Sequence, residues 1–181
     1  MLLSEKQERL RSEVREFAEA NLRSGLMENT RGPRFPHEAY LAVCKRGYMG
    51  FMLPNTYGGS GGGVTEYCIL LEELARVDHN VAWAIDVTVA VASVIGRLGT
   101  EAQRRKYLPG LMDGSVIPAF ALSDLTGGAK LKQIGTFASR AVDGTWSITG
   151  RKAHIHNCEL ANLWLIFAAS ADGQEAILYE G

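Results

Sequence analysis

Residues 100–122, TEAQRRKYLPGLMDGSVIPAFAL, contain the change of pattern that decides the fold of this chain. Thr100 and Gln103 have the spacing of a capping box, which predicts the start of a helix. Beyond Gly114, short runs of β-branched and aromatic residues alternate with turn residues, as is typical of strands. The sequence therefore predicts helices before Gly114 and strands after it.

Four further helices are expected upstream, because apolar residues recur there at helical spacing. The predicted helix at 81–98 is apolar on almost every side, but Asp86 interrupts its apolar run. We therefore expect a buried core helix rather than a membrane span. The residues expected to cap or open the four helices are Ser4, Pro36, Thr65 and Asn80.

Six short strands are expected downstream, bounded by turn residues. The pair Asp143-Gly144 lies between two of them and is a strong hairpin signal. Asp172-Gly173 predicts a second turn. The predicted strands lie near residues 116–122, 134–142, 145–149, 152–157, 162–168 and 175–179.

Helices first and strands later indicate an α+β fold in two domains. We expect an all-helical bundle at residues 1–115 and a partial antiparallel β-domain at residues 116–181. Six short strands would leave sheet edges unpaired, which compact proteins normally cover. The chain is therefore expected to be a fragment, or to need a partner that completes the sheet.

The composition is that of an ordinary globular protein, 46% hydrophobic and 22% charged, with a formal net charge of -1. This balance gives no broad electrostatic attraction to nucleic acid or to an anionic membrane. Three cysteines without a Cys-x-x-Cys pair favour a reducing compartment, and Cys44 and Cys68 are expected to pack in the core. The N-terminus lacks a signal-peptide pattern, so a cytoplasmic location is expected, or the mitochondrial matrix in a eukaryote.

Two local patterns resemble binding sites. His154 and His156, two apart on a predicted strand, would share one face of it, a spacing compatible with a metal ion. No third ligand stands at a sensible spacing, so no metal site is predicted. The glycine-rich residues 57–63 fail the dinucleotide fingerprint because Val64 replaces its last small residue, and we expect a surface loop there.

Three segments carry a family likeness. The first is LPNTYGGSG at 53–61, followed by LLEELAR at 70–76; the second is GTEAQRRKYLP at 99–109. The third is AFALSD at 119–124, followed by KAHIHN at 152–157. Together, and in this order, they resemble the acyl-CoA dehydrogenase family, and the likeness covers essentially the whole chain.

The resemblance implies a helical domain, a β-domain that holds FAD, and a C-terminal helical bundle that lies outside these 181 residues. It also implies an oxidoreductase of fatty-acid metabolism that removes the α-proton of an acyl-CoA and transfers a hydride from the β-carbon to flavin. The family's glutamate base belongs to the C-terminal bundle, so no residue here is expected to be catalytic and the chain alone is expected to be inactive. Implied partners are acyl-CoA, further copies or a second subunit that supplies the bundle, and electron-transfer flavoprotein.

The resemblance places the flavin beside residues 120–123, where Phe120, Leu122 and Ser123 match the segment that lines it. Ser123 replaces a usual threonine and keeps a hydroxyl that can donate a hydrogen bond. The family's T-E-P-x-A-G-S-D stretch is SDLTGGAK here, at 123–130. Its glycine is kept as Gly128. On the substrate side, Ala129 lacks the usual hydroxyl, and Lys130 would meet a phosphate or be solvated.

The family's W-I-T-N strand is HIHN here, at 154–157. His154 takes the place of the tryptophan that packs on the flavin, Ile155 is kept, and His156 takes the place of the threonine near N5. In the helical part, Val91 and Ile95 would either pack in the core or line the acyl pocket. Two functions therefore stay open: an acyl-CoA dehydrogenase, or a non-catalytic homologue that binds acyl-CoA or a partner.

Overall fold

A computed structural model describes residues 3–26, 35–125, 130 and 133–181. The chain divides into a helical unit, Met1–Val116, and a β unit, Ile117–Gly181. This division lies one residue from the predicted one. Helices followed by a sheet confirm the predicted α+β class.

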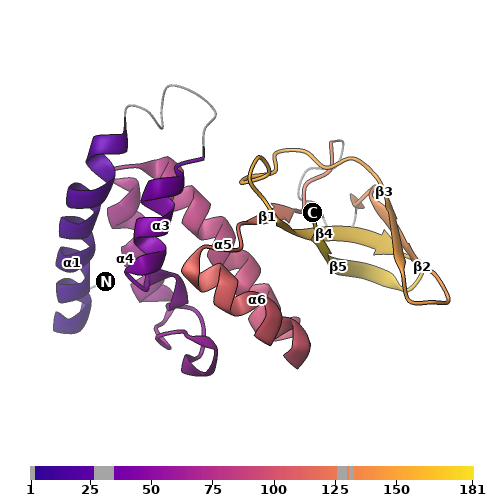
Figure 1. Cartoon of the computed structure of the whole chain (residues 1–181), viewed down its shortest axis with the longest axis horizontal. Helices are drawn as coiled ribbons and strands as arrows, with labels where there is room; N and C mark the ends of the chain where they lie inside the picture. Colours follow the sequence, from indigo (N-terminus) through magenta and orange to yellow (C-terminus); the bar gives the residue numbers. More distant parts are fainter. Residues whose placement is uncertain (1–2, 27–34, 126–129, 131–132) are drawn as a thin grey trace. The chain divides into compact units, whose positions relative to one another are not determined.

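The helical unit is a bundle in which α1 packs on α4, α4 on α5, and α5 on α6 (Figure 1). Short 3-10 turns, η1 to η3, join some of the helices. The bounds are α1 Glu5–Leu22, η1 Arg23–Gly25, α3 His37–Lys45, η2 Tyr48–Gly50, η3 Asn55–Tyr57, α4 Val64–Ala75, α5 His79–Leu98 and α6 Glu101–Asp113.

Two predicted capping boxes are confirmed. The Ser4 backbone N–H donates to the Gln7 side chain over 2.9 Å, and the Thr100 N–H donates to the Gln103 side chain over 2.8 Å. In each box the N-cap hydroxyl accepts from the backbone N–H three residues on. These reciprocal bonds satisfy N–H groups that have no partner inside the helix.

Two predicted caps were wrong by one or two residues. Asp78, rather than Asn80, caps α5, because its carboxylate accepts from the Asn80 N–H over 2.9 Å. Helix α4 begins at Val64 and not after Thr65. The cause is Glu66, whose carboxylate accepts from the Gly63 N–H over 3.0 Å and so extends the helix toward the glycine loop.

Helix α5 is the core helix that the sequence predicts. Its length and composition would suit a membrane span, a property that buried helices share. Most of its apolar residues are buried against α3, α4 and α6. The Tyr40 hydroxyl and the Thr88 Oγ1 are 3.0 Å apart in this core, and Thr88 also donates to the Ala84 carbonyl.

The cysteine prediction is half right. Cys44 is buried beside Tyr40, and burial raises the pKa of its thiol to about 12. Cys68 is exposed instead of packed. Helical spacing placed it at the margin of the apolar stripe of α4, where one step of rotation decides between core and solvent.

The β unit contains one mixed sheet of five strands within the described residues. Its longest strands, β4 and β5, form an antiparallel hairpin, whereas β1 and β2 both run parallel to β4. The predicted sheet was antiparallel; the long connections into β4 allow the parallel pairings instead. The bounds are β1 Pro118–Ala121, β2 Phe137–Arg140, β3 Trp146–Thr149, β4 Leu163–Ser170 and β5 Gly173–Glu180.

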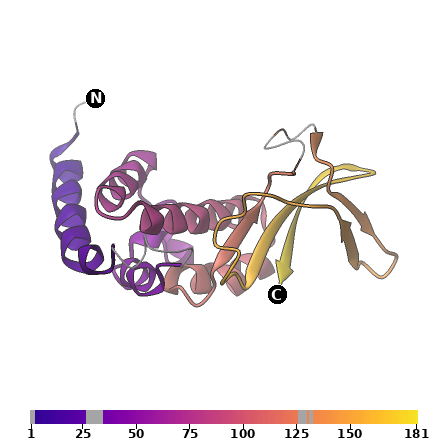
Figure 2. The same cartoon turned by 90° about the horizontal axis from the view of Figure 1, so that it is seen from above.

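Both predicted turns are present. Gly144 has a φ of +88° in the turn between β2 and β3, a conformation that favours glycine. Ser170 pairs with Gly173 across the turn between β4 and β5. Strand β2 meets β4 at the single pair Phe137–Ala169, and the β2–β3 hairpin projects away from β4 beyond it (Figure 2).

The predicted strand at 152–157 is wrong. Only Lys152 makes a sheet-like bridge, to Asp124, and residues 156–160 form a turn. His154 and Asn157 have φ values of +56° and +63°, which no strand contains. The argument that His154 and His156 share a strand face therefore fails.

Candidate functional site

The site begins where β1 ends. Phe120 packs on Phe167 of β4, with ring centroids 5.1 Å apart. The next two residues, Leu122 and Ser123, leave the sheet and are half-buried. The Ser123 hydroxyl has no hydrogen-bond partner among the residues that the structure describes, so it is available as a donor.

A second segment lies beside the end of β1. The Ala153 N–H donates to the Ser123 carbonyl over 2.9 Å, and the Asn157 side chain donates to the Pro118 carbonyl over 3.2 Å. These bonds bring together two segments about thirty residues apart in the sequence. We call residues 122–124 and 152–157 the edge site.

A buried ion pair holds the two halves of the edge site. Asp124 is 5% exposed, and its Oδ1 lies 3.0 Å from the Lys152 Nζ. Lys152 also donates to the Leu122 carbonyl over 2.9 Å. Thr136 Oγ1 and the Gly135 N–H each donate to Asp124 over 2.6 Å. The carboxylate therefore joins the end of β1 to the residues that lead into β2 as well as to Lys152.

The pKa of Asp124 reflects this environment. Burial acts to raise the pKa, but hydrogen bonds from Thr136, Lys152 and two backbone N–H groups outweigh it and hold the pKa at about 2. Asp124 is therefore a carboxylate at neutral pH and a very weak base. Sequence reasoning missed its pairing with Lys152, because nothing in the spacing of the two residues predicts a contact.

Backbone strain is concentrated in the edge site. His154 and Asn157 are the non-glycine residues with positive φ in the described part of the chain. A left-handed residue costs roughly 1–2 kcal/mol, and such residues cluster at ligand-binding positions. Both imidazoles, His154 and His156, are exposed, and Ile155 between them is half-buried.

Five other predicted site residues fall outside the two ranges that define the edge site. Lys130 is exposed, while Gly128 and Ala129 lie outside the described residues. Val91 and Ile95 are 0% and 1% exposed inside the helical unit. A side chain without exposed surface cannot contact a substrate unless the bundle moves, so their burial supports core packing.

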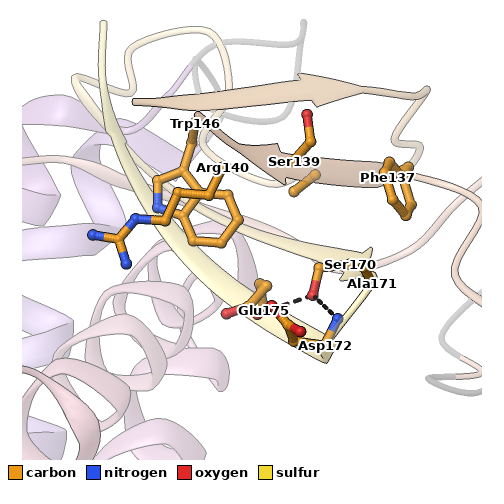
Figure 3. A pocket seen from close by; sticks show the side chains of 9 residues that line it. Phe137, Ser139, Arg140, Trp146, Ser170, Ala171, Asp172 and Glu175 are labelled. Carbon is orange, nitrogen blue, oxygen red and sulfur yellow. Dashed lines mark hydrogen bonds between the residues drawn. The ribbon is translucent and has the colours of Figure 1, made fainter. Parts of the chain in front are cut away.

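A pocket that the sequence did not indicate lies elsewhere in the β unit. It has a volume of about 350 Å³ and lies between the β2–β3 hairpin and the β4–β5 turn (Figure 3). The Arg140 guanidinium lies 5.7 Å from the centre of the Trp146 ring on one side. On the other side, the Ser170 hydroxyl donates to Glu175 over 3.0 Å. The pocket shares no lining residue with the edge site.

Metal binding finds no support in the described ranges. No group of three or more His, Cys, Asp or Glu side chains there is placed to hold a metal ion. The edge site contains a hydroxyl at Ser123, imidazoles at His154 and His156, and the apolar side chains of Leu122 and Ile155.

Comparison with known proteins gives consistent matches over the whole chain. The family model described as "Acyl-CoA dehydrogenase, N-terminal domain" matches residues 4–115. The short-chain-specific acyl-CoA dehydrogenase of Clostridium acetobutylicum is 35% identical over 167 residues, which cover 92% of this chain and 44% of that protein. The chain thus spans less than half the length of this relative.

Solved structures extend the likeness to the β unit. Butyryl-CoA dehydrogenase from Megasphaera elsdenii matches 99% of this chain and 49% of its own, with a TM-score of 0.88 and 29% identity. A glutaryl-CoA dehydrogenase from Mycobacterium smegmatis, solved in complex with FADH2, matches 98% of this chain and 46% of its own, with a TM-score of 0.91 and 25% identity. Sequence and fold together show that the chain belongs to the acyl-CoA dehydrogenase family.

Proposed function

We propose that this chain forms the helical and flavin-side part of an FAD-dependent acyl-CoA dehydrogenase, which oxidises an acyl-CoA to its 2,3-enoyl-CoA. One observation carries the proposal. The family likeness assigns two segments to the flavin, 120–123 and 154–156, and the residues that flank the second segment bind to the strand end that carries the first: Ala153 to Ser123 and Asn157 to Pro118.

The groups of the edge site fit the polar edge of a flavin ring. Ser123 has a half-buried hydroxyl, and His156 is an exposed residue. The carbonyls of Leu122 and Ser123 accept bonds from Lys152 and Ala153, which hold this part of the main chain in place. A ring bordered by acceptor atoms needs such donors.

FAD, when bound, supplies the acceptor for the hydride that leaves the β-carbon of the acyl thioester. The residues of this chain bind and orient the ring. Ser123 would hold the ring through a hydrogen bond from its hydroxyl, and His154 stands at the position where the family likeness implies a tryptophan that packs on the ring. The left-handed backbone at His154 lies between Ala153 and Asn157, which both bind the strand end, and a segment held in this way needs little ordering to bind a ring.

We further propose that the base for the α-proton lies outside residues 1–181. The carboxylate at the edge site, Asp124, is buried, ion-paired and held at a pKa of about 2. A carboxylate with so low a pKa is poorly matched to proton abstraction at neutral pH. This supports an inactive isolated chain, whose turnover can be measured with an acyl-CoA and an artificial electron acceptor. Robust turnover would reveal a base within these residues.

The FAD assignment is tested by titration. The purified chain is mixed with FAD, and binding is followed by visible absorbance and by quenching of flavin fluorescence. We expect a yellow complex and a Ser123→Ala variant that binds roughly tenfold more weakly, the scale of one hydrogen bond to a ligand. Ser139→Ala, an exposed change away from the edge site, is the control. A chain that never takes up FAD contradicts the proposal.

A non-catalytic homologue is the second candidate function, and the edge site itself favours it. His154 and His156 are exposed in a bend and a turn, where the family likeness implies a tryptophan and a threonine on a strand. The complete protein distinguishes the two functions. Bleaching of bound FAD by acyl-CoA would establish the dehydrogenase, whereas acyl-CoA binding without bleaching would establish the homologue.

The assembly and location are proposed from the same family membership. The complete protein is expected to work as a homo-oligomer, or with a second subunit that supplies the C-terminal bundle, in the cytoplasm or mitochondrial matrix. Electron-transfer flavoprotein is the proposed acceptor of its electrons. Light scattering of the complete protein, with and without that acceptor, measures the assembly directly.

A further inference from the structure

We infer that the buried pair Asp124–Lys152 is a positioning element, which holds the two halves of the edge site at a fixed separation before FAD binds. The inference rests on the proposed flavin function and adds residues that the family likeness did not assign to it. Neither side chain needs to touch the ring. Each acts through the main chain that carries Ser123 and His154.

The backbone contact between the two halves is weak by itself. It consists of one isolated bridge between Asp124 and Lys152. The Ala153 N–H donates to Ser123 over 2.9 Å, but the bond from the Leu125 N–H to the Arg151 carbonyl is 3.4 Å long. Two such bonds do not fix a register, because a register is fixed by a run of pairs or by side chains.

The side chain of Lys152 supplies the missing constraint. Its ammonium group lies between the Leu122 carbonyl, 2.9 Å away, and the Asp124 carboxylate, 3.0 Å away. It therefore binds on both sides of Ser123. Because the lysine side chain is only 12% exposed, water competes little for these bonds.

Asp124 extends the constraint to a third segment. Its carboxylate accepts from the Gly135 N–H and from both the N–H and the hydroxyl of Thr136. The pair thus connects the end of β1, the residues that lead into β2, and the segment that begins at Lys152. A displacement of the end of β1 must break bonds to both other segments, and a displacement of either of those must break its bonds to Asp124.

The position of the strained residue supports the inference. His154 follows the anchored pair Lys152 and Ala153 by one residue and has a φ of +56°. Left-handed residues persist only where surrounding structure holds them. A buried ion pair adds little net stability compared with an apolar pair of similar volume. Its position between two ligand-side segments therefore indicates a role in geometry.

The test compares Lys152→Met, which keeps the length of the side chain and removes its charge, with Arg151→Met, an exposed neighbour that loses the same charge. Three quantities are measured in the complete chain: the FAD dissociation constant, the visible circular dichroism of bound FAD, and amide hydrogen exchange in the peptides 118–125 and 151–160. We expect Lys152→Met to bind FAD roughly tenfold or more weakly, the scale of supporting contacts around other bound groups. Amide hydrogen exchange of Lys152→Met should be faster than that of the parent in those two peptides. Arg151→Met should match the parent in FAD affinity, dichroism and exchange.

The outcomes separate the inference from the proposed function. A parent chain that does not bind FAD overturns both. A parent that binds FAD, with a Lys152→Met variant equal to it in affinity and dichroism, overturns the positioning role alone. If Lys152→Met fails to fold, the double variant Asp124→Asn/Lys152→Met is used in its place, because it leaves no buried charge without a partner. Weaker binding with altered dichroism in that variant supports the inference, and parental binding overturns it.

Discussion

The two units hold a buried carboxylate in different ways. In the helical unit, Glu73 is 1% exposed and accepts two bonds from Arg15, of 2.8 and 2.7 Å, but the arginine side chain is 48% exposed. In the β unit, Asp124 is 5% exposed and its partner Lys152 is only 12% exposed. One pair joins two helices at the rim of a bundle, whereas the other is enclosed beside the edge site.

The difference shows what each unit needs from a charged pair. The bundle already has a continuous apolar core around α5, so the Arg15–Glu73 bond only fastens α1 to α4. The two halves of the edge site are joined by two backbone bonds and by the Asn157 side chain, and we assign their separation to Asp124 and Lys152. Removing one partner of the pair should therefore lower the free energy of unfolding slightly in the bundle and strongly in the β unit.

The largest effect is expected from Asp124→Ala. Lys152 would keep its charge with almost no access to water, and breaking an enclosed pair in this way costs about 3–5 kcal/mol of unfolding free energy. Urea unfolding of the β unit, followed by the fluorescence of Trp146 and Trp164, measures the change. Asp172→Ala, at an exposed turn, should stay within about 0.5 kcal/mol. Equal losses in the two variants would show that the pair is not enclosed in solution.

The variant Leu74→Ala in α4 measures how much the apolar core of the bundle contributes to stability, for comparison with the ion pair of the β unit. The side chain is 0% exposed, and its removal leaves a cavity that costs about 2–5 kcal/mol. The matched control is Leu98→Ala, because that leucine is 80% exposed and should change stability by less than about 0.5 kcal/mol. Thermal unfolding followed by circular dichroism at 222 nm reports on the helices. A small loss at Leu74 would mean that the bundle repacks around the gap.

The stability of the β unit at acid pH should follow the protonation of Asp124. Its pKa in the folded chain is about 2, below the ordinary 3.8, so the stabilisation is present above pH 4 and is lost as pH falls through 2. A shift of this size corresponds to about 2 kcal/mol. Unfolding free energies of the parent and of Asp124→Asn are measured between pH 5 and 2. The variant should lose less stability over this range, and an identical slope in both proteins would contradict the assignment.

The smallest loss of stability is expected from removing the charge of Glu73, which pairs with Arg15 at the rim of the bundle. Glu73→Gln removes the charge but keeps the shape, and the half-exposed Arg15 can return to water, so we expect a loss of about 1–2 kcal/mol. Arg105→Met, which breaks an exposed bond to Glu101, should cost less than about 0.5 kcal/mol. Urea unfolding of both variants measures the difference. A loss at Glu73 as large as that at Asp124 would remove the contrast between the two units.

Prediction from the sequence was most successful where neighbours in the chain determine the structure. The capping boxes at Ser4 and Thr100 and the turn at Gly144 depend on residues three apart or closer. It failed at 152–157, where β-branched and polar residues suggested a strand. Local propensity could not show that this segment turns back across the end of β1 and has no strand partner beyond Lys152.

By itself, the sequence determined the α+β class, the order of helices and strands, and the family, because hydrophobic periodicity, caps and turn residues act over a few positions. Tertiary structure alone decided that β4 runs parallel to β1 and that Asp124 meets Lys152. It also decided that His154 and His156 lie on a strained turn. The two pairings join residues 45 and 28 positions apart in the sequence, where pairing follows from packing and charge burial in three dimensions.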